Sequence, residues 1–218
     1  AGEAIMAAMK TANPKAVWVA QAWGACPYPD MIKHLKNGDM LVLDLYSETR
    51  PQWGDPESTW LRKEGFNGHD WAFCMLLNFG GNVGLYGKLQ HVVDEYYKAR
   101  QSKFASTLKG VGLTMEGIEN NPVMYELVSE LPWRNNKFGW QEWLNNYVEA
   151  RYGNINNTKV HDAWMLLARS VYGASDKVLE QGCHESVLCA RPALDVYQVS
   201  SWSEMEEFYN PDDVIRAA

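Results

Sequence analysis

The sequence predicts an α/β protein, in which about four β/α units come before an α-helical region. Four short apolar runs alternate with segments of helical periodicity, which is typical of βαβ units and a parallel sheet. After the fourth run, helical patterning alone continues. A complete eight-unit barrel needs about 200–250 residues. We therefore expect residues 1–132 to form about half of a (β/α)8 TIM barrel and residues 133–218 to begin an α-helical domain.

The four apolar runs have the length and composition of buried strands. They are predicted at Ala16–Trp23, Met40–Tyr46, Trp71–Leu77 and Leu108–Thr114. Apolar stripes at helical spacing predict the helices, which are Ala4–Ala12, Asp30–Lys36, Leu85–Arg100, Pro122–Glu130, Trp140–Arg151 and Thr158–Tyr172. Because the chain opens on a helix with no strand before it, we expect it to be a fragment of a longer protein.

Charge and motif content exclude several kinds of partner and cofactor. The formal net charge is −7 and there is no run of Lys and Arg, so a nucleic-acid partner is not expected. The longest apolar stretches are about seven residues, whereas a membrane-spanning helix needs about 20. The five histidines have no metal-ligand spacing, and nucleotide-binding and GxSxG motifs are absent from the sequence. No metal or cofactor is therefore predicted.

The four cysteines show no CxxC spacing, which argues against metal and redox motifs. A free, partly buried thiol is the expected state of each. Cys183 and Cys189 lie six residues apart and could form a disulfide. The sequence leaves that alternative open, because it does not fix their geometry.

The carboxyl ends of the predicted strands carry the candidate functional residues, because function in parallel α/β folds gathers there. In chain order these are Trp23, Asp44, Asn78, Asn82 and Glu116, of which Asn78 and Asn82 belong to a Gly-rich run. Trp71 is also expected near a strand mouth. Rings, amides and carboxylates together suit a neutral sugar, because hydroxyl groups need hydrogen-bond partners and C–H faces need an aromatic wall. Ten Trp and eleven Tyr fit this interpretation, although core packing accounts for most of them.

Each candidate also has a structural interpretation. Glycoside hydrolysis uses two carboxyl groups, about 5–5.5 Å apart in the retaining mechanism. Glu116 is placed for one of them, but on the residues alone a solvent-facing or helix-capping glutamate is the more common case. Asp44 is as suited to anchoring the strand end as to binding sugar. For Trp23 a packing role and a sugar contact are equally expected, whereas for Trp71 a packing role is favoured.

Several motifs, in this order along the chain, resemble those of the family 89 α-N-acetylglucosaminidases. They include LVLDLYSETRP from Leu41, NFGGNVGLYG from Asn78, TMEGIENN from Thr114 and LPWR from Leu131. The resemblance implies the C-terminal half of a catalytic barrel followed by the start of a helical domain. It also implies removal of terminal α-linked N-acetylglucosamine from glycans with retention of configuration. Under it, Glu116 is the nucleophile, Trp23 contacts the sugar, and His184 is the nearest match to a pocket histidine.

One family feature has no match in this sequence. The acid/base glutamate of the family lies at the end of an earlier strand, so we expect the chain to lack it and to be inactive in isolation. A non-catalytic sugar-binding or scaffolding role is the alternative. The expected partner is a glycan with terminal α-N-acetylglucosamine, and self-association through open barrel edges is also expected. The resemblance implies a secreted, periplasmic or lysosomal protein.

Overall fold

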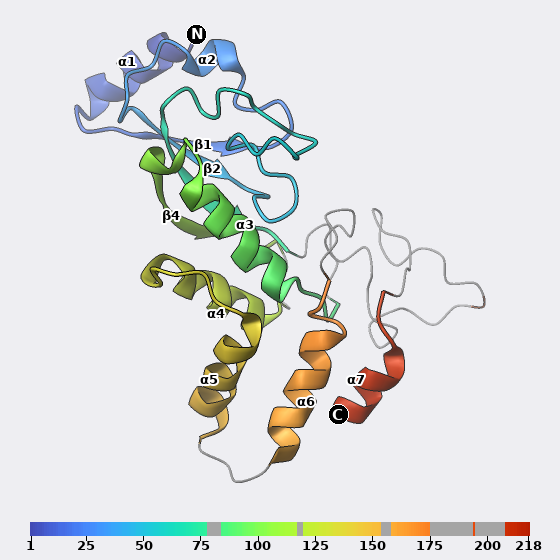
Figure 1. Ribbon diagram of the computed structural model, residues 1–218. Helices are drawn as coiled ribbons and strands as arrows, with labels where there is room; N and C mark the ends of the chain where they lie inside the picture. The colour runs from blue at the N-terminus through green and yellow to red at the C-terminus, as the bar shows by residue number, and fades with distance from the viewer. Residues whose placement is uncertain (78–83, 117–119, 154–157, 175–193, 195–207) are drawn as a thin grey trace. The chain divides into compact units, whose positions relative to one another are not determined.

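The structure is a computed structural model, and it describes residues 1–77, 84–116, 120–153, 158–174, 194 and 208–218 (Figure 1). The chain divides into two compact units. The first comprises Ala1–Met75 and Glu95–Thr114, and the second comprises Leu76–Asp94 and Met115–Ala218.

The first unit is built on a four-stranded parallel sheet. Its strands are β1 (Trp18–Ala22), β2 (Met40–Asp44), β3 (Asp70–Met75) and β4 (Leu108–Leu113), and they lie in the order β1-β2-β3-β4. All three pairings are parallel, with Ala22 opposite Asp44 and Asp44 opposite Phe73. The carboxyl ends of the first three strands therefore meet at one edge of the sheet. The four predicted strands and their parallel arrangement are confirmed.

The strand residues explain why this sheet forms. On β2, Met40, Val42 and Asp44 are buried on one face, while the leucines between them are half-buried. Strand β3 is buried almost throughout, as expected for a parallel strand covered on both faces. Strand β4 passes close to β3 at Gly112, where a Cβ atom would stand 2.5 Å from the sulfur of Cys74. Only glycine fits that approach without displacing Cys74.

Helices α1 (Gly2–Ala12) and α2 (Pro29–Ile32) and the short 3-10 helix η1 (Ala105–Thr107) belong to the first unit. Helix α2 is shorter than the predicted Asp30–Lys36. After Ile32 the chain turns, and the Asp39 carboxylate accepts a hydrogen bond from the Lys36 N–H at 3.3 Å and pairs with Lys10. These interactions hold residues 33–39 as turns rather than as another helical turn.

The second unit is helical. It contains the first residues of α3 (Leu89–Gln101), which continues into the first unit, and then α4 (Pro122–Glu130), η2 (Leu131–Trp133), α5 (Trp140–Tyr152), α6 (Thr158–Arg169) and α7 (Pro211–Ala217). Asn121 ties several segments together. Its Oδ1 accepts from the Tyr86 N–H and the Tyr172 hydroxyl at 3.3 and 3.2 Å, and its Nδ2 donates to the Gly84 carbonyl at 3.1 Å.

Candidate functional site

Three aromatic side chains, Trp23, Tyr46 and Trp60, lie together beyond the carboxyl ends of the strands and are called the aromatic wall below. Trp23 directly follows β1, Tyr46 lies two residues beyond β2, and Trp60 comes from the long loop of residues 45–69. The Trp23 and Trp60 rings meet edge to face at 4.9 Å, and Trp23 stacks on Tyr46 at 6.0 Å. Tyr46 is buried and Trp60 half-buried, whereas Trp23 is 41% exposed. Trp23 therefore packs against Tyr46 and Trp60 and is still partly exposed.

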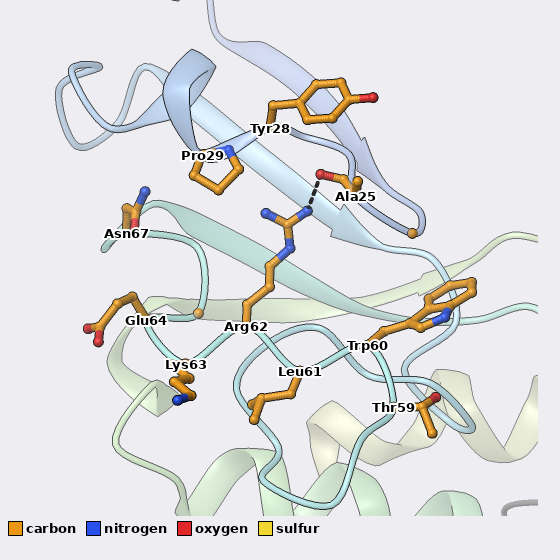
Figure 2. Close-up of a pocket in the computed structure, with 12 residues that line it drawn as sticks. Ala25, Tyr28, Pro29, Thr59, Trp60, Leu61, Arg62, Lys63, Glu64 and Asn67 are labelled. Atoms are coloured by element: carbon orange, nitrogen blue, oxygen red, sulfur yellow. Dashed lines mark hydrogen bonds between the residues drawn. The ribbon is translucent and has the colours of Figure 1, made fainter.

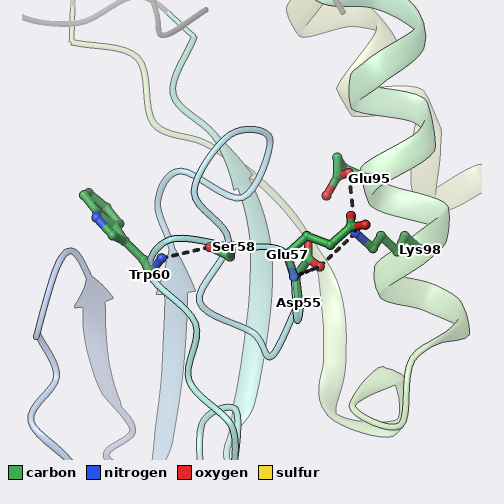
Figure 3. A network of polar contacts seen from close by, with 6 residues as sticks. All are labelled: Asp55, Glu57, Ser58, Trp60, Glu95 and Lys98. Atoms are coloured by element: carbon green, nitrogen blue, oxygen red, sulfur yellow. Dashed lines mark hydrogen bonds and ion pairs between the residues drawn. The ribbon is translucent and has the colours of Figure 1, made fainter. Parts of the chain in front are cut away.

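Ion pairs fix the loop that carries Trp60. The Lys98 ammonium of α3 lies 2.8 Å from Asp55 Oδ1 and 2.6 Å from Glu57 Oε2, with Glu95 at 3.9 Å (Figure 3). Burial opposes the charged form of Lys98, but its bonds to Asp55 and Glu57 outweigh this, and its pKa lies above the ordinary value. Next to this cluster, the Trp60 N–H donates to the Ser58 hydroxyl at 3.1 Å.

Asp44 anchors the start of the same loop. It is fully buried, and its Oδ2 accepts from the N–H groups of Gln52 and Trp53 at 2.8 and 3.0 Å. Burial raises the pKa of Asp44 to about 7, although these hydrogen bonds act in the opposite direction. The hydrogen bonds of Oδ2 correspond to the structural alternative for Asp44, because both donors belong to the loop that follows β2. The sugar-binding alternative stays a prediction.

Arg62 joins the loop after β2 to the loop after β1. Its Nε donates to Gln52 Oε1 at 2.6 Å. Its terminal nitrogens donate to three successive carbonyls just beyond Trp23, those of Ala25, Cys26 and Pro27, at 2.6–3.0 Å. Trp23 and Cys26 also exchange backbone hydrogen bonds at 3.2 and 3.0 Å. The guanidinium thus holds in place the loop to which Trp23 belongs.

A cavity of about 590 Å³ lies between these two loops (Figure 2). Its lining after β1 is Gly24, Ala25, Tyr28 and Pro29, and its lining after β2 is residues 59–65 and Asn67. Tyr28, Pro29, Trp60 and Leu61 supply apolar surface, and the side chain of Arg62 crosses the cavity to reach Ala25. The volume is within the range of small-molecule sites, which is about 300–1,000 Å³.

Glu116 lies three residues beyond the last residue of β4. Thr114 holds that strand end in place through hydrogen bonds. Its backbone N–H donates to the Met75 carbonyl at 3.0 Å, and its hydroxyl lies 3.0 and 3.1 Å from the carbonyl oxygens of Leu45 and Met75. The Glu116 side chain is exposed. Glu116 is therefore at the end of the strand where the sequence predicts it.

The other predicted site residues are placed differently. Trp71 is the second residue of β3, at its amino end, and only 1% of it is exposed. It stacks on Trp53 at 6.0 Å and donates its ring N–H to the Phe104 carbonyl at 3.2 Å. The expectation that Trp71 lies near a strand mouth is wrong, because the strand begins rather than ends there. Asn78, Asn82 and His184 lie outside the described residues.

Three further observations concern the described residues alone. They contain no group of three or more His, Cys, Asp or Glu side chains that could hold a metal ion. No helix among them is long and apolar enough to cross a membrane. Within the same residues Cys26 and Cys74 are free thiols, whereas Cys183 and Cys189 are outside them.

A parallel β/α sheet with an aromatic wall and a cavity at its carboxyl edge is the arrangement of β/α-barrel enzymes. Comparison with known families is more specific. The α-N-acetylglucosaminidase (NAGLU) tim-barrel domain matches residues 1–135, and the α-N-acetylglucosaminidase (NAGLU) C-terminal domain matches residues 143–218. The chain belongs to the α-N-acetylglucosaminidase family, and its fold is part of a TIM barrel followed by a helical region. The resemblance seen in the motifs is confirmed.

Individual relatives support the same family. Human α-N-acetylglucosaminidase is 34% identical over 98% of this chain. A Clostridium perfringens family 89 enzyme, solved as a double Glu-to-Gln variant with its substrate GlcNAc-α-1,4-galactose, matches 99% of the chain at 28% identity and a TM-score of 0.81. The C. perfringens family 89 enzyme with PUGNAc matches at 29% and 0.80. The chain spans 28% of the human protein and 23% of each solved chain.

No motif in the sequence singles out Trp60 and Arg62. Both lie in the segment of residues 45–69, which the sequence shows only as polar and rich in Pro and Gly. One signal was available, because a connection longer than about 12–15 residues without regular structure is commonly functional. Three of the partners of Arg62 are backbone carbonyls more than 30 residues away in sequence, and no motif marks such partners.

Proposed function

We propose that this chain is part of a retaining exo-α-N-acetylglucosaminidase, which removes terminal α-linked N-acetylglucosamine from glycans. One observation carries the proposal: Glu116 lies three residues beyond the carboxyl end of a parallel strand, within the residues that match the family barrel. Active sites of such barrels are built from residues in these positions.

In the proposed reaction the Glu116 carboxylate attacks the anomeric carbon, and the bond to the leaving oxygen breaks. A second carboxyl group gives that oxygen a proton and then takes one from the water that releases the sugar. Asp44 does not suit this second role, because it is buried and holds the loop backbone. We infer that the acid/base belongs to a part of the family barrel that this chain does not match.

Trp23 is the residue we propose for the apolar face of the terminal sugar. Its exposed ring is braced by Tyr46 and Trp60, so it is held ready before the ligand arrives. The expected partner is a glycan with terminal α-N-acetylglucosamine. The secreted, periplasmic or lysosomal location stays a prediction.

Replacing the proposed nucleophile tests the function. In the full-length protein, Glu116→Gln should lower kcat on an aryl α-N-acetylglucosaminide by about three orders of magnitude or more, because no covalent intermediate can form. Circular dichroism should stay unchanged, since the side chain is exposed. Glu142→Gln, at an exposed carboxylate of α5, is the matched control and should retain activity.

A second measurement separates a nucleophile from a residue that merely binds. With Glu116→Ala in the full-length protein, azide should enter the vacated space and restore turnover of a substrate with an activated leaving group, giving a β-glycosyl azide. Full activity of Glu116→Gln would reject the assignment. So would a Glu116→Ala variant whose lost activity azide leaves unrestored.

A non-catalytic sugar-binding role is the second candidate, because the described strand ends present Glu116 as an exposed carboxylate while Asp44 is buried. For a polypeptide of these 218 residues it predicts sugar binding by titration calorimetry without hydrolysis of the aryl glycoside. Hydrolysis by that polypeptide would exclude this role.

A further inference from the structure

We propose that Arg62 is a positioning residue, which sets the place of the Trp23 ring and through it the binding of the terminal sugar. The proposal rests on the proposed function, in which Trp23 receives the apolar face of that sugar. The Arg62 guanidinium donates four hydrogen bonds, and each acceptor is a protein oxygen. The side chain is half-buried and extends from the loop after β2 to the loop after β1 (Figure 2). Its action is therefore on the protein rather than on the sugar.

Trp23 is held by a strand on one side only. The residue before it, Ala22, is the last residue of β1 and is paired with Asp44 of β2. On its other side lies a turn, in which the backbones of Trp23 and Cys26 exchange hydrogen bonds. Arg62 Nη2 donates at 2.6 Å to the Cys26 carbonyl, which also accepts the Trp23 N–H at 3.2 Å. A displacement of the guanidinium is therefore transmitted to the Trp23 backbone through one shared oxygen.

The other end of the Arg62 network is anchored on β2. The Arg62 Nε donates at 2.6 Å to Oε1 of Gln52, which is fully buried. The Gln52 N–H in turn donates at 2.8 Å to Oδ2 of Asp44, the last residue of β2. The contacts thus run from the end of β2, through the loop and the guanidinium, to the residue that follows β1. Because β1 and β2 are themselves paired, this path fixes Trp23 relative to the sheet.

Ring packing alone does not give the same precision. The Trp23 ring is 41% exposed, and it stacks on Tyr46 at 6.0 Å and meets Trp60 edge to face at 4.9 Å. Such ring contacts tolerate a range of centroid distances, whereas hydrogen bonds constrain both distance and angle. A ring that is already in place loses less entropy when the sugar binds. Arg62 therefore contributes to sugar affinity without touching the sugar.

Kinetics of the full-length protein on an aryl α-N-acetylglucosaminide test the proposal. Arg62→Ala should raise KM about 10-fold and change kcat less than about 2-fold, because a ring contact serves the bound sugar and the transition state alike. Arg62→Lys keeps the charge but not the forked geometry, so it should show most of the same rise. Arg151→Ala removes an arginine of α5 that pairs with Glu126. It is the matched control and should keep the wild-type KM.

A double substitution separates positioning from direct contact. In a Trp23→Ala background, Arg62→Ala should raise KM by less than about a further 2-fold, because a residue that acts through Trp23 has no ring left to position. Direct contact between Arg62 and the sugar, or a general loosening of the protein, would instead multiply the two effects. Multiplied effects would overturn the proposal, and so would an unchanged KM in Arg62→Ala.

A spectroscopic measurement needs neither turnover nor sugar. Near-ultraviolet circular dichroism reports the fixed packing of aromatic rings, and the difference between the wild type and Trp23→Phe isolates the signal of Trp23. This difference should shrink when both proteins carry Arg62→Ala and stay unchanged when both carry Arg151→Ala. Far-ultraviolet spectra check the fold, and Arg62→Lys replaces Arg62→Ala in the comparison should the latter unfold.

The two readouts also separate this proposal from the proposed function. A reduced Trp23 signal in Arg62→Ala, in a protein that hydrolyses no α-N-acetylglucosaminide, would support the positioning of Trp23 and reject only the proposed function. A Trp23 signal that keeps its full size without the Arg62 guanidinium would overturn the positioning role, whatever the activity of the protein.

Discussion

The carboxyl group of Asp44 is buried, and its ionisation should make the stability of the protein depend on pH. Burial raises its pKa from 3.8 to about 7. Between these two values the folded chain keeps a proton that the unfolded chain has released. Stability should therefore fall as the pH rises from about 4 to about 7, and this group should add no further change above that. At about 1.4 kcal/mol per pKa unit, the loss is on the order of a few kcal/mol.

Asp44→Asn isolates this contribution, because an amide keeps an acceptor oxygen for the Gln52 and Trp53 N–H groups and carries no charge. We expect the melting temperature of the wild type to fall by several degrees relative to that of the variant between about pH 5 and pH 8. Calorimetry of both proteins across this range measures the difference, with Glu142→Gln as an exposed-carboxylate control. A constant difference would mean that Asp44 keeps its charge throughout.

At the scale of single residues, the sequence predicts which side chains lie at strand ends, but it does not predict which of them are buried. Glu116 and Trp23 lie where the predicted strands end, because strand position follows from the apolar pattern. The burial of Asp44 depends on residues 52 and 53 folding back over it, and the sequence does not show that return. Trp71 lies at the amino end of β3 rather than at a strand mouth, because it opens the apolar run, and it is buried against Trp53.

At the scale of elements, one lysine connects the loop after β2 to α3. Lys98→Met should destabilise the protein by roughly 3 kcal/mol, because Asp55 is fully buried and would lose its positive partner. Glu57→Gln should cost less than about 1 kcal/mol, because Glu57 is 66% exposed. Urea unfolding of the three proteins gives both values. Equal losses for the two variants would contradict the central role of the buried pair.

Arg62 connects the loops after β1 and β2, and a lysine cannot reproduce its forked geometry. Arg62→Lys should lower the free energy of unfolding by roughly 2 kcal/mol, since most of its bonds to Gln52 and the loop carbonyls are lost. Residues 24–29 should also become more sensitive to limited proteolysis. Lys15→Ala, at an exposed lysine between α1 and β1, is the control. Unchanged proteolysis of this loop in Arg62→Lys would show that the loop holds itself in place.

The elements themselves were predicted well, and their ends less so. Helix α4 has the predicted ends, because Asn121-Pro122 marks its start and its apolar stripe is clear. Helix α3 begins at Leu89 rather than Leu85, because the Gly87 and Leu89 N–H groups donate to the carbonyls of Val171 and Tyr172. Such tertiary partners cannot be seen in local sequence. Helix α7 was missed, although Asn210 caps it and Pro211 opens it.

At the scale of the whole molecule, the fold class followed from the alternation of strands and helices, and the family match agrees with it. A partial barrel has a specific physical consequence. Among the described strands, β1 pairs only with β2 and β4 pairs only with β3. Each of these two outer strands therefore has one side along which its backbone N–H and C=O groups face no other described strand. Side chains beside these edges are apolar and exposed, with Val19 at 55% and Leu113 at 39%.

Open strand edges recruit other strands. A polypeptide limited to these 218 residues should therefore form dimers or larger assemblies, with an average mass by light scattering that rises with concentration. Val19→Lys should weaken this association, because a lysine beside an edge strand opposes pairing with a second chain. Ile215→Lys, at a 66% exposed position of α7, changes hydrophobicity equally without touching an edge and should leave association unchanged. A monomer at every concentration would contradict the prediction, and equal effects of the two variants would place the contact outside the β1 edge.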